Sequence, residues 1–394
     1  MNKTKRNRRL FITLSVIIII VAPLIGALIN YKGDLASHFF TFPPTDATPK
    51  PGFNLTIFIV LLFACAFFVV LYLYPWIFGF KRPEQRETPK ITKVKYPIWF
   101  WIGLTVAIID AIILWGHFSR PRFIINLGFI PIIWGLVFTI DGIVYKRSNG
   151  HSIVKDRPVN LLWIGICSAF GWGYFEYLSL YVGVNWYYPE AHMLSTFEFY
   201  IYAFVGGAAL VPFLFEIFML LYTFKKLNRR YSYGPKVSLS KSVQIILLTI
   251  GVISLFLISF FPFILYPLLW IGPVLILSII FDMVGLWTPF KPIVKEGNWT
   301  PLALIGLGNL ISGLICEGTN FLSANHNPFH TFVPGYWKYS IPYVDKFHVF
   351  EMPFEGLFGY LPYGIYNWIV WIAFAYFFKI TTQFDDEELI KKAY

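Results

Sequence analysis

Carboxylates inside apolar segments are the residues of this sequence that can do chemistry. Nine acidic side chains fall within long hydrophobic runs, and no Lys or Arg lies deep in any of these runs. A charged group at the centre of a bilayer costs ~2.5–3.5 kcal/mol on insertion scales, so such side chains usually face a protein interior or an aqueous cavity. Because desolvation favours the neutral form of a carboxyl group, we expect groups that donate or share protons, or that bind a cation.

Seven of these carboxylates are the candidate catalytic groups. They are Asp141, Glu176, Glu198, Asp282, Glu317, Glu351 and Glu355. Glu176 and Glu317 lie late in outward-running segments, and Glu198 and Glu351 lie early in the inward-running segments that follow, so two Glu pairs are expected near the outer boundary. The two aspartates lie nearer the inner side. For all of them the alternative role is a structural hydrogen bond to a neighbouring helix.

Aromatic side chains accompany the outer pairs. The segments 183–195 and 323–347 are longer and more aromatic than plain connectors, and we expect them to cover a ligand site. Aromatic faces attract cations, and a developing carbocation is attracted in the same way. The candidate substrate-binding residues are Trp172, Trp186, Tyr187, Asn320, Trp337 and Tyr339.

These candidate residues lie in long apolar runs, which must position them. The runs predict an all-α, multi-pass helical membrane protein. The chain is 57% hydrophobic and 13% charged, whereas soluble domains carry about 25% charged residues. Ten runs are long enough to cross a hydrocarbon layer of ~30 Å. They are 10–29, 53–80, 97–116, 123–145, 158–182, 196–223, 242–264, 267–290, 301–322 and 348–378. Several Pro and Gly residues in the last run predict that it is broken.

The basic residues predict the orientation of these spans. Alternate connections, counted from the N-terminus, hold 26 of the Lys and Arg residues, and the other connections hold 6. Since cytoplasmic loops carry the excess of Lys and Arg, both termini are expected in the cytoplasm and the chain in the cell membrane. The net charge of +11 then reflects topology, and no nucleic-acid partner is expected.

An internal repeat is suggested by spacing. Asp141 and Glu176 are 35 residues apart, as are Asp282 and Glu317. Aromatic loops and Phe-Glu dipeptides follow each pair in the same order. We therefore expect two parallel four-helix copies, 97–235 and 236–394, preceded by two additional helices and a basic loop in 1–96.

No cofactor or metal site is predicted. Phosphate-binding GxxxxGK[ST], dinucleotide-binding GxGxxG and metal-binding HExxH patterns are absent from the sequence. His326 and His330, with His348 and Glu351 following, could make a metal site together with Glu317. Pro328 between the first two histidines argues against a continuous helix that presents both on one face.

Four segments resemble a family of uncharacterised prokaryotic membrane proteins. They are GWGYFEYLSL (171–180), NWYY (185–188), WKYSIPY (337–343) and FEMP (350–353). More distantly, 350–355 is similar to the Pro-x-Glu-Glu stretch of integral-membrane lycopene cyclase domains, and this resemblance implies carboxylates that protonate a polyene. The sequence departs from that pattern because position 356 is Gly and because the first copy, Phe197-Glu198-Phe199-Tyr200, lacks the proline.

Three functions remain open at this point. The first is an enzyme that acts on an isoprenoid- or carotenoid-like lipid, an apolar small molecule that enters from the bilayer. The second is a proton- or cation-coupled transporter or channel, with Asp141 and Glu176 in one half-pathway and Asp282 and Glu317 in the other. The third is a non-catalytic assembly subunit that docks through its aromatic loops. Membrane lipids are the expected partners in each case, and the sequence predicts no oligomeric state.

Overall fold

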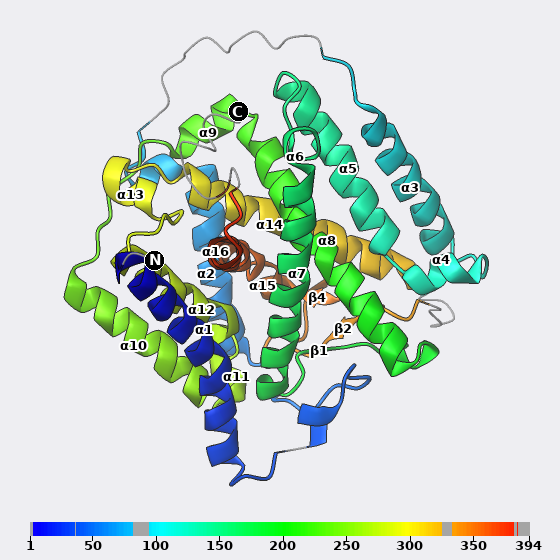
Figure 1. Cartoon of the computed structure of the whole chain (residues 1–394). Coiled ribbons are helices and arrows are strands. Elements are labelled where there is room, and N and C mark those ends of the chain that lie inside the picture. Colours follow the sequence, from blue (N-terminus) through cyan, green and yellow to red (C-terminus); the bar gives the residue numbers. More distant parts are fainter. Residues whose placement is uncertain (1–2, 36, 82–93, 325–332, 382–383, 385–394) are drawn as a thin grey trace.

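The fold is a bundle of helices with very little sheet (Figure 1). The computed structural model describes all residues except 1–2, 36, 82–93, 325–332, 382–383 and 385–394. The longer helices are α1 (Lys3–Asn30), α2 (Leu55–Leu73), α3 (Ile98–Trp115), α5 (Ile130–Arg147), α7 (Pro158–Ser179), α8 (Thr196–Tyr222), α10 (Lys241–Leu257), α12 (Leu268–Met283), α14 (Thr300–Ser323) and α16 (Tyr360–Phe378).

Short elements connect the long helices. They are α4 (Arg122–Leu127), α6 (Ile153–Asp156), α9 (Lys225–Tyr231), α11 (Pro262–Leu265), α13 (Lys291–Glu296) and α15 (Phe354–Leu357), with β1 (Trp186–Tyr187), β2 (Lys338–Tyr339), β3 (His348–Val349) and β4 (Met352–Pro353). The connections also contain the 3-10 turns η1 (Ser37–Phe40), η2 (Pro75–Phe78), η3 (Leu180–Val182) and η4 (Ala191–Met193).

The helices have the length and composition of membrane spans. Within the described residues, six segments are long and apolar enough to cross a bilayer: 7–30, α2, α3, α8, α14 and 354–378. The apolar helices α10 and α12 are shorter. Large hydrophobic side chains lie exposed along the outer faces of these helices, as Trp101, Ile102 and Ile108 do on α3. Because so much exposed apolar surface requires lipid as its solvent, the chain is a helical membrane protein.

The last predicted span is wrong at its beginning. Residues 348–353 form the β3–β4 hairpin, in which Val349 pairs with Met352, and helix starts only at Phe354. The predicted break does occur, at Phe358 and Gly359 between α15 and α16. Pro353 contributes to the late start, because the residue before a proline is disfavoured in the helical region.

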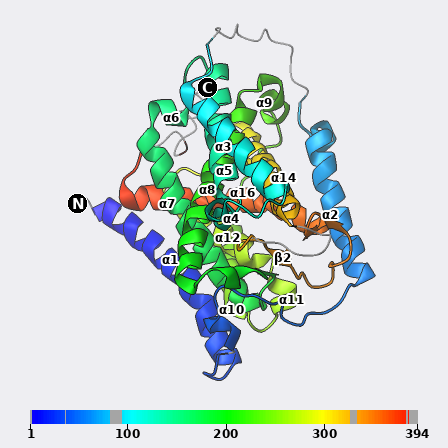
Figure 2. The same cartoon turned by 90° about the vertical axis from the view of Figure 1, so that its right-hand side faces the viewer.

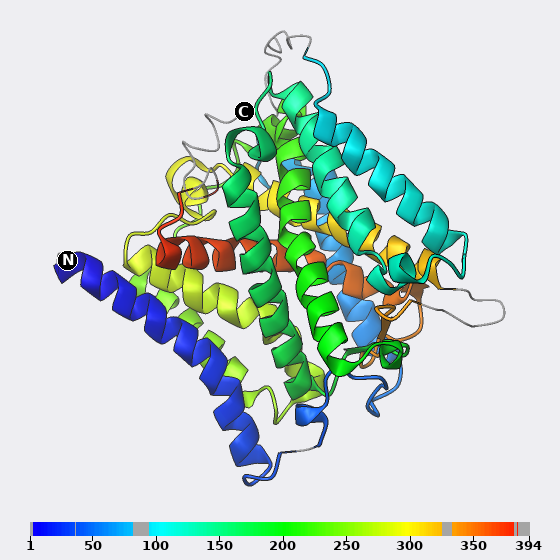
Figure 3. The same cartoon turned by 45° about the vertical axis from the view of Figure 1, so that its right-hand side comes forward.

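Two groups of helices pack in the same order. In the first group α3 contacts α5, α5 contacts α8, and α7 contacts α8. In the second group α10 contacts α12, α12 contacts α16, and α14 contacts α16. The groups join where α14 packs on α8 and α16 packs on α7, and Figure 3 shows α16 crossing behind α7 and α8.

Glycines allow the closest helix contacts. A Cβ atom on Gly103 of α3 would lie 2.6 Å from the carbonyl oxygen of Gly135 of α5, and the reverse distance is also 2.6 Å. Gly251 of α10 and Gly272 of α12 also face each other, but less closely: the corresponding distances are 3.2 and 3.5 Å. Small residues of this kind let helix backbones approach in membranes, where lipid supplies no hydrophobic drive for association.

The short elements lie at two opposite ends of the body. In Figure 1, α6, α9 and α13 lie in the upper part, and β1, β2 and β4 lie in the lower part. Helix α2 stands at the margin of the helix bundle (Figure 2), and Cys65 is its only buried residue. The strand-bearing end covers the site described next.

Candidate functional site

A central cavity of about 440 Å³ lies among α2, α7, α8, α12, α14, α15 and α16. This volume falls within the range of ~300–1,000 Å³ that is typical of small-molecule sites. Aromatic side chains form much of its wall, including Trp172, Phe175, Trp186, Trp270 and Trp337. Three carboxyl groups also line it, and none of its described lining residues is Lys, Arg or His. The cavity is therefore apolar with isolated acidic groups.

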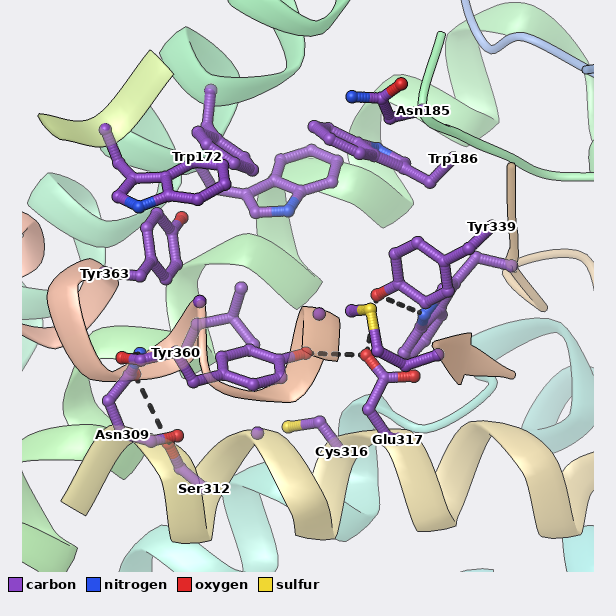
Figure 4. A pocket seen from close by; sticks show the side chains of 18 of the residues that line it. Trp172, Asn185, Trp186, Asn309, Ser312, Cys316, Glu317, Tyr339, Tyr360 and Tyr363 are labelled. Atoms are coloured by element: carbon purple, nitrogen blue, oxygen red, sulfur yellow. Dashed lines mark hydrogen bonds between the residues drawn. The ribbon is translucent and has the colours of Figure 1, made fainter. Parts of the chain in front are cut away.

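Glu317 of α14 is the most completely buried of these acids, at 0% exposure. Its Oε1 accepts hydrogen bonds from the hydroxyl groups of Tyr339 and Tyr360, each at 2.6 Å (Figure 4). Its Oε2 has no hydrogen-bond partner among the described residues. Burial raises the pKa of Tyr339 well above its usual range, so this hydroxyl keeps its proton and acts as a donor. Two donors on one oxygen hold the carboxyl in place and leave the other oxygen available.

Glu176 of α7 has a related arrangement and is 6% exposed. Its Oε1 accepts hydrogen bonds from Trp186 Nε1 at 2.6 Å and from the Tyr188 hydroxyl at 2.7 Å. Burial also raises the pKa of Tyr188 well above its usual range. Both donors come from the loop immediately after the helix, so Glu176 ties that loop to α7.

Glu355 of α15 is the third carboxyl group in the cavity wall. It is 7% exposed, and neither of its oxygens has a hydrogen-bond partner among the described residues. Trp270 and Tyr202 also line the cavity, and the Trp270 Nε1 and the Tyr202 hydroxyl lack partners in the described part of the chain. A buried polar group left unpaired costs ~1–3 kcal/mol, so these atoms indicate where a polar part of a ligand would bind.

The aromatic loops form a roof over the cavity. Strands β1 and β2 pair antiparallel, with Trp186 opposite Tyr339 and Tyr187 opposite Lys338. Asn320 holds this roof to α14, because its side chain donates to the Trp337 carbonyl at 2.8 Å and accepts from the Trp337 N–H at 3.0 Å. Asn320 thus positions Trp337 and is itself absent from the cavity wall.

A strap from the first connection, residues 41–54, crosses the outer side of the roof. Lys50 Nζ donates to the Val184 carbonyl at 2.8 Å, to Asn185 Oδ1 at 2.6 Å and to the Ser340 carbonyl. Burial lowers the pKa of Lys50 to about 7. The Tyr188 N–H donates to the Pro44 carbonyl at 2.8 Å. The strap therefore joins both aromatic loops through one ammonium group.

Of the predicted site residues, seven line this cavity. They are Trp172, Glu176, Trp186, Glu317, Trp337, Tyr339 and Glu355. Five others, besides Asn320, are absent from its wall: Asp141, Tyr187, Glu198, Asp282 and Glu351.

The glutamates outside the cavity have local partners. Glu198 is exposed and forms a capping box with Ser195 at the start of α8. Glu351 accepts a hydrogen bond from the Tyr336 hydroxyl. The expectation that Glu351 lies within a helix is wrong, since it occupies the turn between β3 and β4. Tyr187 is half-buried in β1, opposite Lys338.

The two aspartates differ in their surroundings. Asp141 is fully buried and accepts from Trp99 Nε1 at 2.8 Å and from the Val154 N–H at 3.0 Å, while the buried Glu216 interacts with it electrostatically. Asp282 is exposed and accepts from Gln244 Nε2 at 3.0 Å. Equal spacing in the sequence therefore does not place them in equal environments.

Metal ligands are not gathered in the part of the chain that the structure describes. No group of three or more His, Cys, Asp or Glu side chains is placed there to hold an ion. His348 Nε2 lies 2.8 Å from Asp345 Oδ1 at the surface. His326 and His330 lie outside the described residues.

The sequence did not single out several polar residues of the cavity, among them Tyr188, Tyr202, Trp270 and Tyr360. Tyr202, Trp270 and Tyr360 lie in apolar helices, where an aromatic residue is ordinary. Tyr188 adjoins two residues that were named, and its position in the NWYY segment was the available signal.

The chain matches no protein-family model, no curated protein and no solved structure.

Proposed function

We propose that this protein binds an isoprenoid- or carotenoid-like lipid in its central cavity and acts on it by carboxylic-acid catalysis. One observation carries the proposal: Glu317, fully buried among aromatic walls, has two tyrosine donors on Oε1 and an unpartnered Oε2. An apolar cavity in a membrane protein suits a substrate that enters from the bilayer.

The proposed reaction is an isomerisation that needs no co-reactant. The O–H bond of the Glu317 carboxyl group breaks as a C–H bond forms at one carbon of a substrate double bond. A neighbouring double bond then attacks the cationic carbon, and a ring closes. A carboxylate finally removes a proton from the adjacent carbon, which restores a double bond and returns the proton to the protein.

The chain's own residues supply three parts of this reaction. The hydroxyl groups of Tyr339 and Tyr360 stabilise the Glu317 carboxylate that proton transfer leaves behind. The indole faces of Trp172, Trp186 and Trp337 lie in the wall, where ring quadrupoles attract positive charge. Trp186, Trp337 and Tyr339 of the roof lie in the cavity wall, and in the proposed reaction they limit the access of water that would otherwise trap the cation.

We further propose ten spans in the cell membrane, with both termini in the cytoplasm. The ten longer helices overlap the ten apolar runs of the sequence, which supports this count. The short helices α6, α9 and α13, which lie in basic connections, are grouped at the end opposite the strands, and this agrees with the distribution of Lys and Arg (Figure 1).

We also propose that 97–235 and 236–394 are duplicated four-helix copies added to 1–96. Three features support the duplication: the common packing order, the reciprocal glycine contacts of α3 with α5 and of α10 with α12, and a Glu–Tyr hydrogen bond in each copy. The β1–β2 pair also joins the two WxY segments to each other.

Deuterium transfer tests the proposed function. Purified protein in liposomes is incubated in D₂O with acyclic isoprenoids, lycopene and geranylgeraniol among them, and the recovered lipid is analysed by mass spectrometry. Acid catalysis places deuterium on carbon. We expect incorporation with wild type and with the exposed-residue control Glu296→Gln, and a loss of at least ~100-fold with Glu317→Gln. Equal incorporation by Glu317→Gln and wild type would refute the role of this acid.

Proton- or cation-coupled transport is the second candidate. It is favoured by buried carboxyl groups that the cavity does not use, because Asp141 and Glu216 lie close together within the first copy. Intramembrane acids often mark ion routes. Proton flux into proteoliposomes that is abolished by Glu216→Gln and retained in Glu317→Gln would select this candidate over the enzyme.

A further inference from the structure

We infer that Glu355 and the Trp270 N–H form a subsite for a hydroxyl group, so that the ligand of the cavity is an isoprenoid alcohol or a similar hydroxylated lipid. This inference rests on the proposed function and deepens it by naming the substrate class. It accounts for Glu355 and Trp270, two cavity residues that the proposed proton transfer does not use.

The first observation is an unmet need for hydrogen bonds. Both carboxyl oxygens of Glu355 and the Nε1 of Trp270 are buried without a partner in the described chain. Glu355 is only 7% exposed. Since both residues line the same cavity, a ligand in that cavity is the natural partner for them.

The second observation is that Glu355 and Trp270 are connected through neighbouring residues of the wall. A Cβ atom on Gly359 would lie 3.6 Å from Trp270 Cζ2, the ring atom on the nitrogen side of the indole. Gly359 follows Glu355 by four residues, and the N–H groups of Phe358 and Gly359 close the turn onto the carbonyls of Glu355 and Gly356. Tyr266 connects them further, because its ring is 6.3 Å from that of Trp270 and it interacts electrostatically with Glu355.

Donor and acceptor capacity selects the ligand group. An indole N–H only donates, and a carboxyl group accepts through its carbonyl oxygen in its neutral as well as its charged form. A hydroxyl oxygen accepts from Trp270 while its hydrogen is donated to Glu355, so it satisfies both groups. An ammonium group has no acceptor for Trp270, and a hydrocarbon satisfies neither group. A hydroxyl is thus favoured over a cationic head group and over a plain polyene.

The rest of the wall requires an apolar body. The lining near this subsite includes Leu61 and Phe68 of α2, Ile271 of α12 and Met352 of β4. Helix α2 has little buried surface and forms one side of the cavity. A hydroxyl group held at Glu355 would therefore place its hydrocarbon chain along aromatic and aliphatic side chains.

Ligand competition tests the subsite. Protein in nanodiscs is titrated with three probes of equal chain length: geranylgeraniol, geranylgeranylamine and the C20 hydrocarbon. Quenching of tryptophan fluorescence gives the Kd of each. We expect the alcohol to bind about 10-fold or more tightly than either other probe, because a site built to hydrogen-bond a hydroxyl group rejects analogues that lack it. An amine or hydrocarbon that binds as tightly as the alcohol would overturn the inference.

Matched variants connect this preference to the two residues. Trp270→Phe keeps an aromatic ring and removes the N–H, and we expect it to reduce the alcohol preference to about 3-fold or less. Trp101→Phe, on the exposed face of α3, is the control and retains the preference. Glu355→Gln keeps an acceptor and preserves most of the preference, whereas Glu355→Leu removes it. A Trp270→Phe protein with the full wild-type preference would contradict the assignment, provided that its thermal transition matches that of Trp101→Phe.

The proposed subsite and the proposed catalysis can be refuted independently of each other. Selective alcohol binding without deuterium incorporation from D₂O would retain the subsite and refute the acid catalysis. Deuterium incorporation into isoprenoids that are bound without head-group preference would retain the catalysis and refute the subsite.

Discussion

Glu176 and Glu317 are held in the same manner but by different parts of the chain. Each is buried and accepts two hydrogen bonds on Oε1 from aromatic side chains. The donors to Glu176 come from one loop, 10 and 12 residues further along the chain. The donors to Glu317 are 22 and 43 residues away, in β2 and α16. Glu317 therefore couples the roof to a transmembrane helix, whereas Glu176 secures a local loop.

The following helices differ in a parallel way. Tyr202 follows Glu198 by four residues, and Glu355 follows Glu351 by four. Both line the cavity with polar atoms that lack partners in the described chain. Four residues after a Phe-Glu dipeptide, the chain thus presents a phenol in one case and a carboxyl group in the other. The comparison indicates one shared cavity whose reactive groups come mainly from the second half.

The sharpest test of this comparison is to neutralise each acid separately. We expect Glu317→Gln to lower deuterium incorporation at least ~100-fold, because general acid catalysis contributes about 10²–10⁴-fold. Glu176→Gln should lower it about 10-fold or less, since it loosens a loop and leaves the acid intact. Initial rates by mass spectrometry measure both. A greater loss in Glu176→Gln would reverse the assignment of the two halves.

Substitution of Asp141 and Asp282 is expected to give the next largest difference, which is in the free energy of unfolding. In Asp141→Asn the amide nitrogen would face either Trp99 Nε1 or the Val154 N–H, so one buried donor loses its acceptor. We expect the free energy of unfolding to fall by about 1–3 kcal/mol. Asp282→Asn, at an exposed site, should change it by less than about 0.5 kcal/mol. Equal effects in denaturant titrations would show that the two positions have equivalent environments after all.

A further effect concerns the roof. Asn320→Leu removes both hydrogen bonds to the Trp337 backbone. We expect hydrogen exchange at the Trp337 amide to accelerate at least ~10-fold, and exchange at Trp186, in the opposite strand, to accelerate less. Ser323→Ala, one turn further along α14, removes only a bond to the Asn320 carbonyl and is the control. Unchanged exchange at Trp337 would contradict the role of Asn320.

The smallest expected effect is the pH dependence of the strap. Burial lowers the pKa of Lys50 to about 7, from 10.5 for a free side chain. Between these values the released strap binds more protons than the docked one, so docking strengthens as pH rises from 7 to 10.5 and is constant below 7. Hydrogen exchange of 44–54, corrected for its intrinsic pH dependence, should show greater protection at pH 9 than at pH 7. Lys50→Met should abolish this difference, and protection that falls with pH would contradict the account.

Sequence patterns predicted the helices better than the site. Apolar runs placed the long helices within several residues of their bounds, because hydrocarbon thickness sets a minimum length. The predicted start of the last helix at residue 348 was wrong, because the aromatic and apolar residues of 348–353 also suit a hairpin. The Asp141 and Asp282 spacing was equal, but burial depends on which helices cover each position.

The cavity could be predicted only in part for the same reason. Trp186, Glu176 and Glu317 carry composition and spacing signals that the sequence displays. The hydrogen bond from Tyr360 to Glu317 spans 43 residues, and the β1–β2 pair joins residues about 150 apart. Such contacts depend on helix packing, which a single sequence does not specify. Glu355 and Trp270 could be linked only from the fold, in which the turn at Gly359 packs against the indole ring of Trp270.

The most direct test of a lipid-binding cavity is mass spectrometry of the lipids that purify with the protein. Ala64 of α2 lines the cavity, whereas Ala66 on the same helix does not, and both alanines are exposed. The account predicts that an isoprenoid-class lipid is enriched in wild type and in Ala66→Trp and is depleted in Ala64→Trp, where an indole ring fills the space. A wild-type lipid profile equal to that of the bulk membrane, or an enriched lipid that Ala64→Trp retains, would contradict it.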